Sequence, residues 1–215
     1  MLGIIRVLTT EGSEILQEHG KKMEEFFGVK TVTHCIPNQP NGIYDDESEK
    51  KAIPKIVELA KQMQEQYELD AITISCAADP GLDEVREVMD IPVLGAGLSG
   101  SHAAAMIGSK VGVIGITEES PIRLQNELAE RYFSHTYSPV LRKTTDLFSE
   151  GSKEELLRVV NEAIQSGADV ILFACTGFST IRLKDYLLQH VSVPVVDLVE
   201  AQAIAYQLIS KGASI

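Results

Sequence analysis

The chain has 215 residues, of which 44% are apolar and 23% are charged, so it can bury an ordinary core and is not expected to be disordered. That length suits one large domain or two small lobes. Nineteen lysines and arginines stand against 31 aspartates and glutamates, which gives a net charge of −12. A surface that acidic argues against nucleic acid and anionic membranes as partners, and we interpret the charge as a source of solubility.

The amino-terminal segment MLGIIRVLTTEG has an apolar run too short for a signal peptide and no basic leader before it. No run approaches the ~20 apolar residues that a membrane-spanning helix needs. We therefore expect a cytoplasmic protein, in which Cys35, Cys76 and Cys175 stay reduced. The cysteine spacings match no zinc pattern and the histidines lack helical ligand spacing, so we expect no metal ion.

Short runs rich in valine and isoleucine alternate with amphipathic segments along the whole chain. In chain order, the predicted strands cover residues 3–9, 29–34, 70–75, 91–95, 110–116, 134–140, 169–174 and 193–197. Clear helical patterns lie at 48–67 and 152–167. The second helix opens with Ser152 three residues before Glu155, the spacing of a capping box, and ends on Gly167. This alternation predicts βαβ units and parallel sheets covered by helices on both faces.

The two halves of the chain resemble each other. LDAITISCAADPGL matches ADVILFACTGFSTI, so that Asp70 corresponds to Asp169 and Cys76 to Cys175, each pair 99 residues apart. Downstream, IPVLGAGLSGSHAAAMI resembles VPVVDLVEAQAIAYQLI. Each half therefore contains four strands in the same order, with a cysteine after the third, which indicates a duplicated lobe.

We predict an α/β fold with two similar lobes, each a four-stranded parallel sheet flanked by helices. A pseudo-two-fold axis relates the lobes, and the active site lies between them. The first lobe is assigned to residues 1–97 plus 203–215 and carries Cys76, and the second is assigned to 98–202 and carries Cys175.

Parallel sheets bind ligands at the carboxyl ends of their strands, where loops and helix starts gather. Both cysteines lie at such ends, and so do Thr10 and Thr117, where the opening strands IIRVLTTE and VGVIGITE end alike. A pseudo-two-fold would face these ends into one shared cleft. The loops expected to rim that cleft cover residues 35–47 and 141–151.

A lone buried cysteine usually acts as a small hydrophobic residue. Cys76 and Cys175 differ because they end strands, repeat each other's position, and precede small residues that leave backbone N–H groups accessible. Such groups can lower the pKa of a thiol. Two thiols across a cleft suit racemisation without a cofactor, because a thiolate removes a proton from carbon and the other thiol returns one to the opposite face. Cys35 has no counterpart and is expected to lie at a strand end near the rim.

Three threonines at or beyond strand ends, Thr10, Thr117 and Thr176, either cap the chain there or bind substrate oxygens. Asp79 could act as a general base beside Cys76. Its position just before Pro80 favours an N-cap followed by a first-turn proline.

The stretch GAGLSG at 95–100 fits the G-x-G-x-x-G fingerprint of dinucleotide sites, and Glu118 ends the next strand. The matching stretch of the second half, DLVEAQ at 197–202, has no glycine. The motif also follows the fourth strand of a repeat, whereas a nucleotide domain carries it after the first. Close packing of a helix on its strand explains these glycines with fewer assumptions, so we expect no cofactor.

At the paired cysteines the chain resembles the aspartate/glutamate racemase superfamily, and more closely its hydantoin racemases. The residues that carry the resemblance are CAADPGLDEVREVMDIPVLGAG (76–97) and ACTGFSTI (174–181), and the similarity in pattern spans nearly the whole length. The resemblance implies a two-lobe fold, no cofactor, and Cys76 and Cys175 as the two acid/base residues. It also implies that substrate oxygens are held by the chain around Ala77, Ala78, Thr117, Thr176 and Gly177.

The residues after the cysteines favour a neutral substrate. Aspartate and glutamate racemases tend to have Asn-Thr after the first cysteine and Thr-His after the second, where this chain has CAA and CTG. No basic residue adjoins either cysteine in the sequence, and the nearest candidate, Arg6, lies inside a strand. We therefore expect a small molecule such as a 5-substituted hydantoin, with Tyr44 and Phe178 as an apolar wall.

Other functions stay open. The chain could racemise aspartate or glutamate, or it could be a decarboxylase or cis–trans isomerase of the same fold that needs one cysteine. It could also be a ligand-binding or regulatory module that uses the lobes as a clamp. Apolar lobes of this size commonly pair, which leaves a homo-oligomer open as well.

Overall fold

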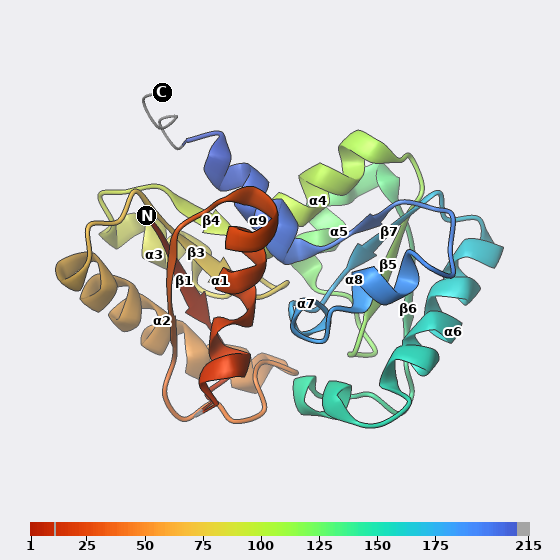
Figure 1. The fold of residues 1–215 in the computed structure, drawn as a ribbon, viewed down its shortest axis with the longest axis horizontal. Coiled ribbons are helices and arrows are strands. Elements are labelled where there is room, and N and C mark those ends of the chain that lie inside the picture. Colours follow the sequence, from red (N-terminus) through yellow and green to blue (C-terminus); the bar gives the residue numbers. More distant parts are fainter. Residues whose placement is uncertain (11, 210–215) are drawn as a thin grey trace.

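The computed structural model describes residues 1–10 and 12–209 and contains two four-stranded parallel sheets (Figure 1). The sheets have the same strand order, β2-β1-β3-β4 in the first lobe and β6-β5-β7-β8 in the second. Helices flank both sheets. The predicted α/β fold of two similar lobes is therefore confirmed.

Each predicted strand overlaps one observed strand. The strands are β1 (Leu2–Arg6), β2 (Thr31–Cys35), β3 (Ala71–Ser75), β4 (Val93–Gly95), β5 (Val111–Gly115), β6 (Tyr132–Tyr137), β7 (Val170–Phe173) and β8 (Val195–Val196). The α-helices are α1 (Ser13–Phe27), α2 (Asp46–Gln66), α3 (Leu82–Val88), α4 (Ala96–Ile107), α5 (Ile122–Leu128), α6 (Ser152–Ser166), α7 (Gly177–Thr180), α8 (Leu183–Leu187) and α9 (Leu198–Gln207), and two 3₁₀ helices cover Ala129–Arg131 and Thr144–Phe148.

The inner strands β1, β3, β5 and β7 are buried along their whole length, which explains why they read as continuous apolar runs. The edge strands β2 and β6 are only half-buried. At the carboxyl edge of the first sheet, Arg6 pairs with Cys35 on one side and with Ser75 on the other. Cys76 therefore emerges next to the end of β1.

The helices that follow β4 and β8 meet between the two sheets (Figure 1). In α9, Val199 and Ala203 pack with Leu2 and Ile4 of the first sheet. In α4, Ala104 belongs to the core of the second sheet. Each lobe thus receives a helix from the other half of the chain. The residue boundaries assigned to the lobes stay a prediction.

The matched aspartates have matched structural roles. Asp70 pairs with the amino terminus of Met1 and accepts a hydrogen bond from the Tyr206 hydroxyl at 2.8 Å. Asp169 accepts the backbone N–H groups of Ser109 and Lys110, the latter at 2.8 Å. Each carboxylate therefore ties the start of the third strand of its lobe to the start of the first strand.

The predicted capping box at the start of α6 is wrong. The N-cap of α6 is Gly151, in the left-handed region with φ of 77°, and the Ser152 hydroxyl donates to the carbonyl of Leu147 instead. Gly167 ends the helix in the left-handed region with φ of 112°, as predicted. None of the helices in the described part of the chain combines the length and apolar character needed to cross a membrane.

Candidate active site

A cavity of about 850 Å³ opens where the carboxyl edges of the two sheets face each other. Both cysteine-bearing loops line it. Seven of the eight predicted site residues are among the lining residues: Cys76, Ala77, Ala78, Thr117, Cys175, Thr176 and Gly177. The structure thus brings together side chains that lie about a hundred residues apart in the sequence.

Thr10, the eighth predicted site residue, is not among the lining residues, and its hydroxyl accepts the N–H of Gly12 at 3.2 Å. Thr10 lies four residues after the end of β1, whereas Thr117 lies two residues after the end of β5. The residue at the position of Thr117 in the first lobe is Leu8, which does line the cavity. Thr10 and Thr117 are therefore not structurally equivalent, and the binding role of Thr10 stays a prediction.

The loop that carries Cys76 is anchored by Asp79. The Asp79 carboxylate accepts the N–H groups of Gly97 at 2.8 Å and Leu98 at 2.7 Å, in the first turn of α4. The predicted N-cap role of Asp79 on the helix after Pro80 is wrong, because the N-cap of α3 is Gly81. Asp79 instead satisfies free N–H groups of a helix 18 residues later. Burial raises the pKa of Asp79 to about 7, although these N–H groups lower it.

The glycines of GAGLSG are explained by close packing, as predicted, although the neighbours are a loop and a helix. A Cβ added to Gly97 would lie 2.2 Å from the Ala77 carbonyl oxygen, and one added to Gly100 would lie 2.3 Å from Cδ2 of Leu198. The first contact presses α4 against the loop that carries Cys76. The second presses α4 against α9.

Cys175 lies between β7 and the short helix α7. Phe178 is fully buried with its ring edge-on to Phe173 at 5.2 Å between ring centroids, and it does not line the cavity. The prediction that Phe178 forms an apolar wall is therefore wrong, since its ring packs in the core of the second lobe. Tyr44 does line the cavity.

Both cysteines are half-buried, and burial raises the pKa of each thiol above its usual range. The backbone N–H groups lower the thiol pKa, as predicted, but by less than burial raises it. The N–H of Ala78 lowers the pKa of Cys76, and the N–H groups of Gly177 and Phe178 lower that of Cys175. Loss of water around the sulfur atoms outweighs these hydrogen bonds.

Thr176 joins the two cysteine-bearing loops directly. Its hydroxyl donates to the carbonyl oxygen of Ser75 at 3.0 Å, and both groups are buried. Because Ser75 precedes Cys76 and Thr176 follows Cys175, this bond ties together the chain next to the two cysteines. The hydroxyl of Thr176 is therefore already engaged by the protein.

Arg6 is a site residue that the sequence interpretation missed. It is only 3% exposed, lines the cavity, and donates to the carbonyl of Ile15 at 2.9 Å and to the hydroxyl of Thr180 at 3.3 Å. Arg6, which the sequence interpretation set aside because it lies inside a strand, therefore reaches the cavity that both cysteines line. The strand β1 ends at Arg6, three residues earlier than predicted, which places the guanidinium at the sheet edge. The available signal was a single charge inside the apolar run GIIRVL.

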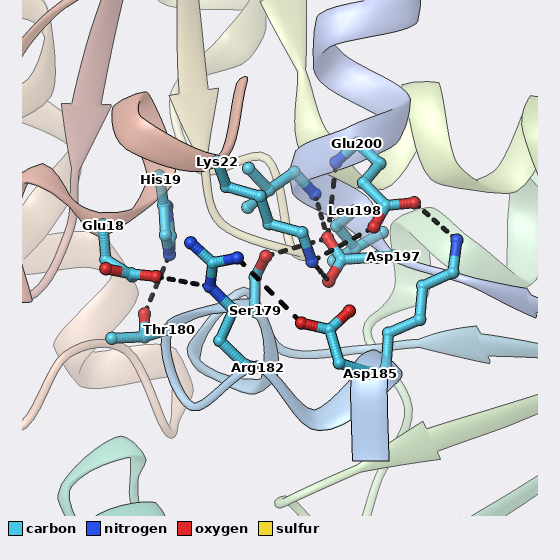
Figure 2. A network of polar contacts seen from close by, with 12 residues as sticks. Glu18, His19, Lys22, Ser179, Thr180, Arg182, Asp185, Asp197, Leu198 and Glu200 are labelled. Atoms are coloured by element: carbon cyan, nitrogen blue, oxygen red, sulfur yellow. Dashed lines mark hydrogen bonds and ion pairs between the residues drawn. The ribbon is translucent and has the colours of Figure 1, made fainter. Parts of the chain in front are cut away.

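A buried polar network lies behind the cavity and joins α1 to the second lobe (Figure 2). His19 lies 2.9 Å from both the Ser75 and the Thr180 hydroxyls, through its two ring nitrogens. Lys22 pairs with Asp197 at 2.8 Å. Burial alone would lower the pKa of Lys22, but the carboxylates that it contacts raise it.

Asp197 connects this network to α9. It accepts the Ser179 hydroxyl at 3.0 Å and the Val199 N–H at 2.8 Å, so it is both an ion-pair partner and the N-cap of α9. Only the N-cap pattern could have been recognised in the sequence, because nothing in it links α1 to residue 197.

The mouth of the cavity is charged. The two loops expected to rim it contribute residues 42–47 and 142–144. The lining includes six acidic residues, Asp45, Asp46, Glu47, Glu49, Glu118 and Glu119, and two basic residues besides Arg6, which are Arg142 and Lys143. Cys35 is not among the lining residues, and its thiol donates weakly to the Thr10 carbonyl at 3.8 Å. Across the described residues, no group of three or more His, Cys, Asp or Glu side chains is placed to hold a metal ion.

The family model described as Asp/Glu/hydantoin racemase matches residues 16–205. The chain belongs to this family, and it is a racemase.

Its relatives include the hydantoin racemase of Pseudomonas sp. (strain NS671), 28% identical over 190 residues that cover 86% of this chain and 75% of the relative. Among solved structures, allantoin racemase from Klebsiella pneumoniae has a TM-score of 0.81 at 19% identity, covering 96% of this chain and 86% of that chain. A glutamate racemase from Bacillus anthracis has a TM-score of 0.71 at 17% identity, covering 97% and 80%. At these identities, the structural similarities concern the fold alone.

Proposed function

We propose that this racemase works without a cofactor, through the thiols of Cys76 and Cys175, on 5-substituted hydantoins. The observation that carries the proposal is that two cysteines at matching positions of the two lobes line one cavity. A base on one side of a carbon acid and an acid on the other side can together invert a carbon centre.

Burial of the two sulfur atoms suits the two tasks. Because burial raises the pKa of both thiols, a thiolate in this cavity is a stronger base than an exposed cysteine thiolate would be. Removal of a proton from carbon needs such a base. The same burial keeps the second sulfur protonated, so that it can return a proton to the opposite face.

The charge around the cavity supports a neutral substrate. Nine charged residues line it, six acidic and three basic, so the mouth is negative overall. A substrate with two carboxylates would meet that negative field on entry. A hydantoin ring carries its acidic C–H next to a carbonyl group, and the curated relative is named for racemisation of such rings.

The experiment is polarimetry in D₂O on a panel of enantiopure 5-substituted hydantoins, aspartate and glutamate, with enzyme-free solutions as the control. We expect loss of optical rotation for a hydantoin, with deuterium at the reacting carbon. Loss of rotation for aspartate or glutamate alone would overturn the substrate assignment. Tight binding of a hydantoin without deuterium exchange would overturn the racemase mechanism in favour of a binding module.

A further inference from the structure

Hydrogen-bond donors lie close to the sulfur of Cys175. Burial raises the pKa of this thiol, whereas the N–H groups of Gly177 and Phe178 and the hydroxyl of Thr144 lower it. The packing is close, because a Cβ added to Gly177 would lie 3.2 Å from this sulfur and 2.9 Å from Cγ2 of Thr144. Donors in this number favour a negative charge on the sulfur.

The sulfur of Cys76 has the opposite surroundings. Burial raises the pKa of Cys76, one backbone donor, the N–H of Ala78, lowers it, and the Cys175 thiol with the carboxyl groups of Asp79 and Glu49 raises it further. The two thiols are therefore inequivalent, although the sequence repeat places them at matching positions.

Arg6 adds a positive charge on the side of Cys175. Its guanidinium donates to the Ile15 carbonyl in α1 and also to the Thr180 hydroxyl in α7, the helix that begins two residues after Cys175. Across residues 1–10 and 12–209, no carboxylate lies within ion-pair distance of Arg6. Burial lowers the pKa of Arg6 to about 10, so the group stays charged at neutral pH. A buried cation of this kind is costly unless an anion faces it.

The other titratable groups near Arg6 do not supply that anion. Glu18 is paired with Arg182 at 2.7 Å, and burial lowers the pKa of His19 far below its usual range, so His19 is neutral. Cys35 does not line the cavity, and its thiol is directed to the Thr10 carbonyl at 3.8 Å. Cys175 is left as the group that can carry the charge.

We propose that Arg6 is the electrostatic partner of Cys175, so that the single thiolate of the active enzyme is on Cys175 while Cys76 keeps its proton. This inference rests on the proposed two-thiol function. Arg6 is a positioning residue in this scheme, because it acts through the Cys175 sulfur.

The proton balance follows from this assignment. The C–H bond of the substrate breaks toward Cys175, which becomes a thiol, and the electron pair of that bond stays on the substrate as its enolate. The S–H bond of Cys76 then breaks, and its proton goes to the opposite face of the carbon. Turnover leaves Cys76 as the thiolate, and exchange of one proton each with water restores the active form. The enantiomer whose C–H faces Cys175 can therefore react without prior proton exchange, because the resting form already has the thiolate on Cys175.

The test is the rate of iodoacetamide alkylation of each cysteine against pH, followed by peptide mass spectrometry on the full chain without substrate. In the unmodified protein, we expect the rate curve of Cys175 to have a lower midpoint than that of Cys76. In Arg6→Gln, alkylation of Cys175 at neutral pH should slow about tenfold, which corresponds to one unit of pKa, and Cys76 should change by less than about twofold. Arg6→Lys should restore most of the rate.

Arg142→Gln is the matched control, because it removes an exposed cation from the rim of the same cavity and should leave both curves in place. Melting curves verify that each variant is folded, and the comparison of the two cysteines in the unmodified protein needs no variant. A midpoint for Cys76 at or below that of Cys175, or equal slowing of both in Arg6→Gln, would overturn the inference.

The readout is independent of activity. Racemisation of a hydantoin together with equal thiol midpoints overturns this inference and leaves the proposed function standing. A lower, Arg6-dependent midpoint for Cys175 in a protein that racemises no panel member supports the Arg6–Cys175 pair and overturns the proposed function.

Discussion

The two lobes share a strand order but differ at the residues that touch the cavity. The central strand of the first sheet ends on Arg6, and that of the second ends on Gly115, whose added Cβ would lie 2.7 Å from the ring of His135. A large side chain is present at the first position, whereas any side chain at the second would have to displace the His135 ring. The repeat therefore preserves the backbone that presents a thiol, while the charge beside that thiol comes from one lobe only.

The loops after the two cysteines differ in the same way. Three residues after Cys76, Asp79 holds its loop by charge on the start of α4, whereas three residues after Cys175, Phe178 holds its loop by burial in the core. A polar anchor and an apolar anchor thus fix equivalent loops. In this chain, the two cysteines keep matching positions although different interactions hold their loops.

The largest expected effect tests whether both lobes take part in the reaction. Cys76→Ala and Cys175→Ala should each lower the racemisation rate by about 10²–10⁴-fold, because each removes one of the two proton carriers. Polarimetry with a substrate identified from the panel measures this. Cys35→Ala is the matched control and should keep its activity. Near-normal turnover in either single active-site variant would replace the two-thiol mechanism with a one-cysteine reaction.

The contact between the lobes should dominate stability. Lys22→Met leaves the buried Asp197 carboxylate without its cation, and we expect a loss of about 3–5 kcal/mol in the free energy of unfolding. Denaturant unfolding measures it, with Lys51→Met as a control, since Lys51 sits in an exposed pair with Glu47. The double variant Lys22→Met/Asp197→Asn should recover part of the loss. Equal stability of Lys22→Met and Lys51→Met would contradict the structure.

The polar anchor of the first lobe should make stability depend on pH. Asp79 has a raised pKa of about 7 in the folded chain, so between about pH 4 and pH 7 the folded state holds a proton that the unfolded state has lost. The contribution of Asp79 to the free energy of unfolding therefore falls as pH rises through that window, by on the order of 4 kcal/mol in total.

Asp79→Asn removes this titration, so the difference in unfolding free energy between the unmodified protein and the variant should change across the window. Denaturant unfolding at a series of pH values measures it. A pH-independent difference would show that Asp79 titrates normally.

The smallest expected effect concerns the hydroxyl that joins the two loops. The residue after Cys175 is Thr176, and the residue after Cys76 is Ala77, so the first lobe offers no equivalent bond. Thr176→Val should cost about 1–3 kcal/mol in unfolding free energy, because the buried Ser75 carbonyl loses its donor. The rate should fall as well, since the spacing of the thiols loosens. Thr176→Ser restores the hydroxyl and should recover both measurements.

Most of the fold could be predicted from the sequence because its signals are local. Continuous valine and isoleucine runs mark strands that are buried on both faces, and Gly167 marks a helix end through a backbone conformation that glycine adopts easily. The strand boundary at Arg6 could not be predicted, since the apolar run continues through Val7 and Leu8 after hydrogen bonding to the neighbouring strands has ended.

The candidate site, too, could be predicted from the sequence only in part. The sequence by itself determined the pair Cys76 and Cys175, because they occupy matching positions of a repeat with an offset of 99 residues. Such a match depends on the order of the residues alone and not on their neighbours in space. Only the tertiary structure decided which groups face those sulfur atoms. Arg6, Asp79 and Phe178 were misassigned from the sequence, since burial and contacts between distant segments direct their side chains, and a repeat carries no information about either. The sequence thus predicts the two thiols, and the packing of the lobes gives them different neighbours.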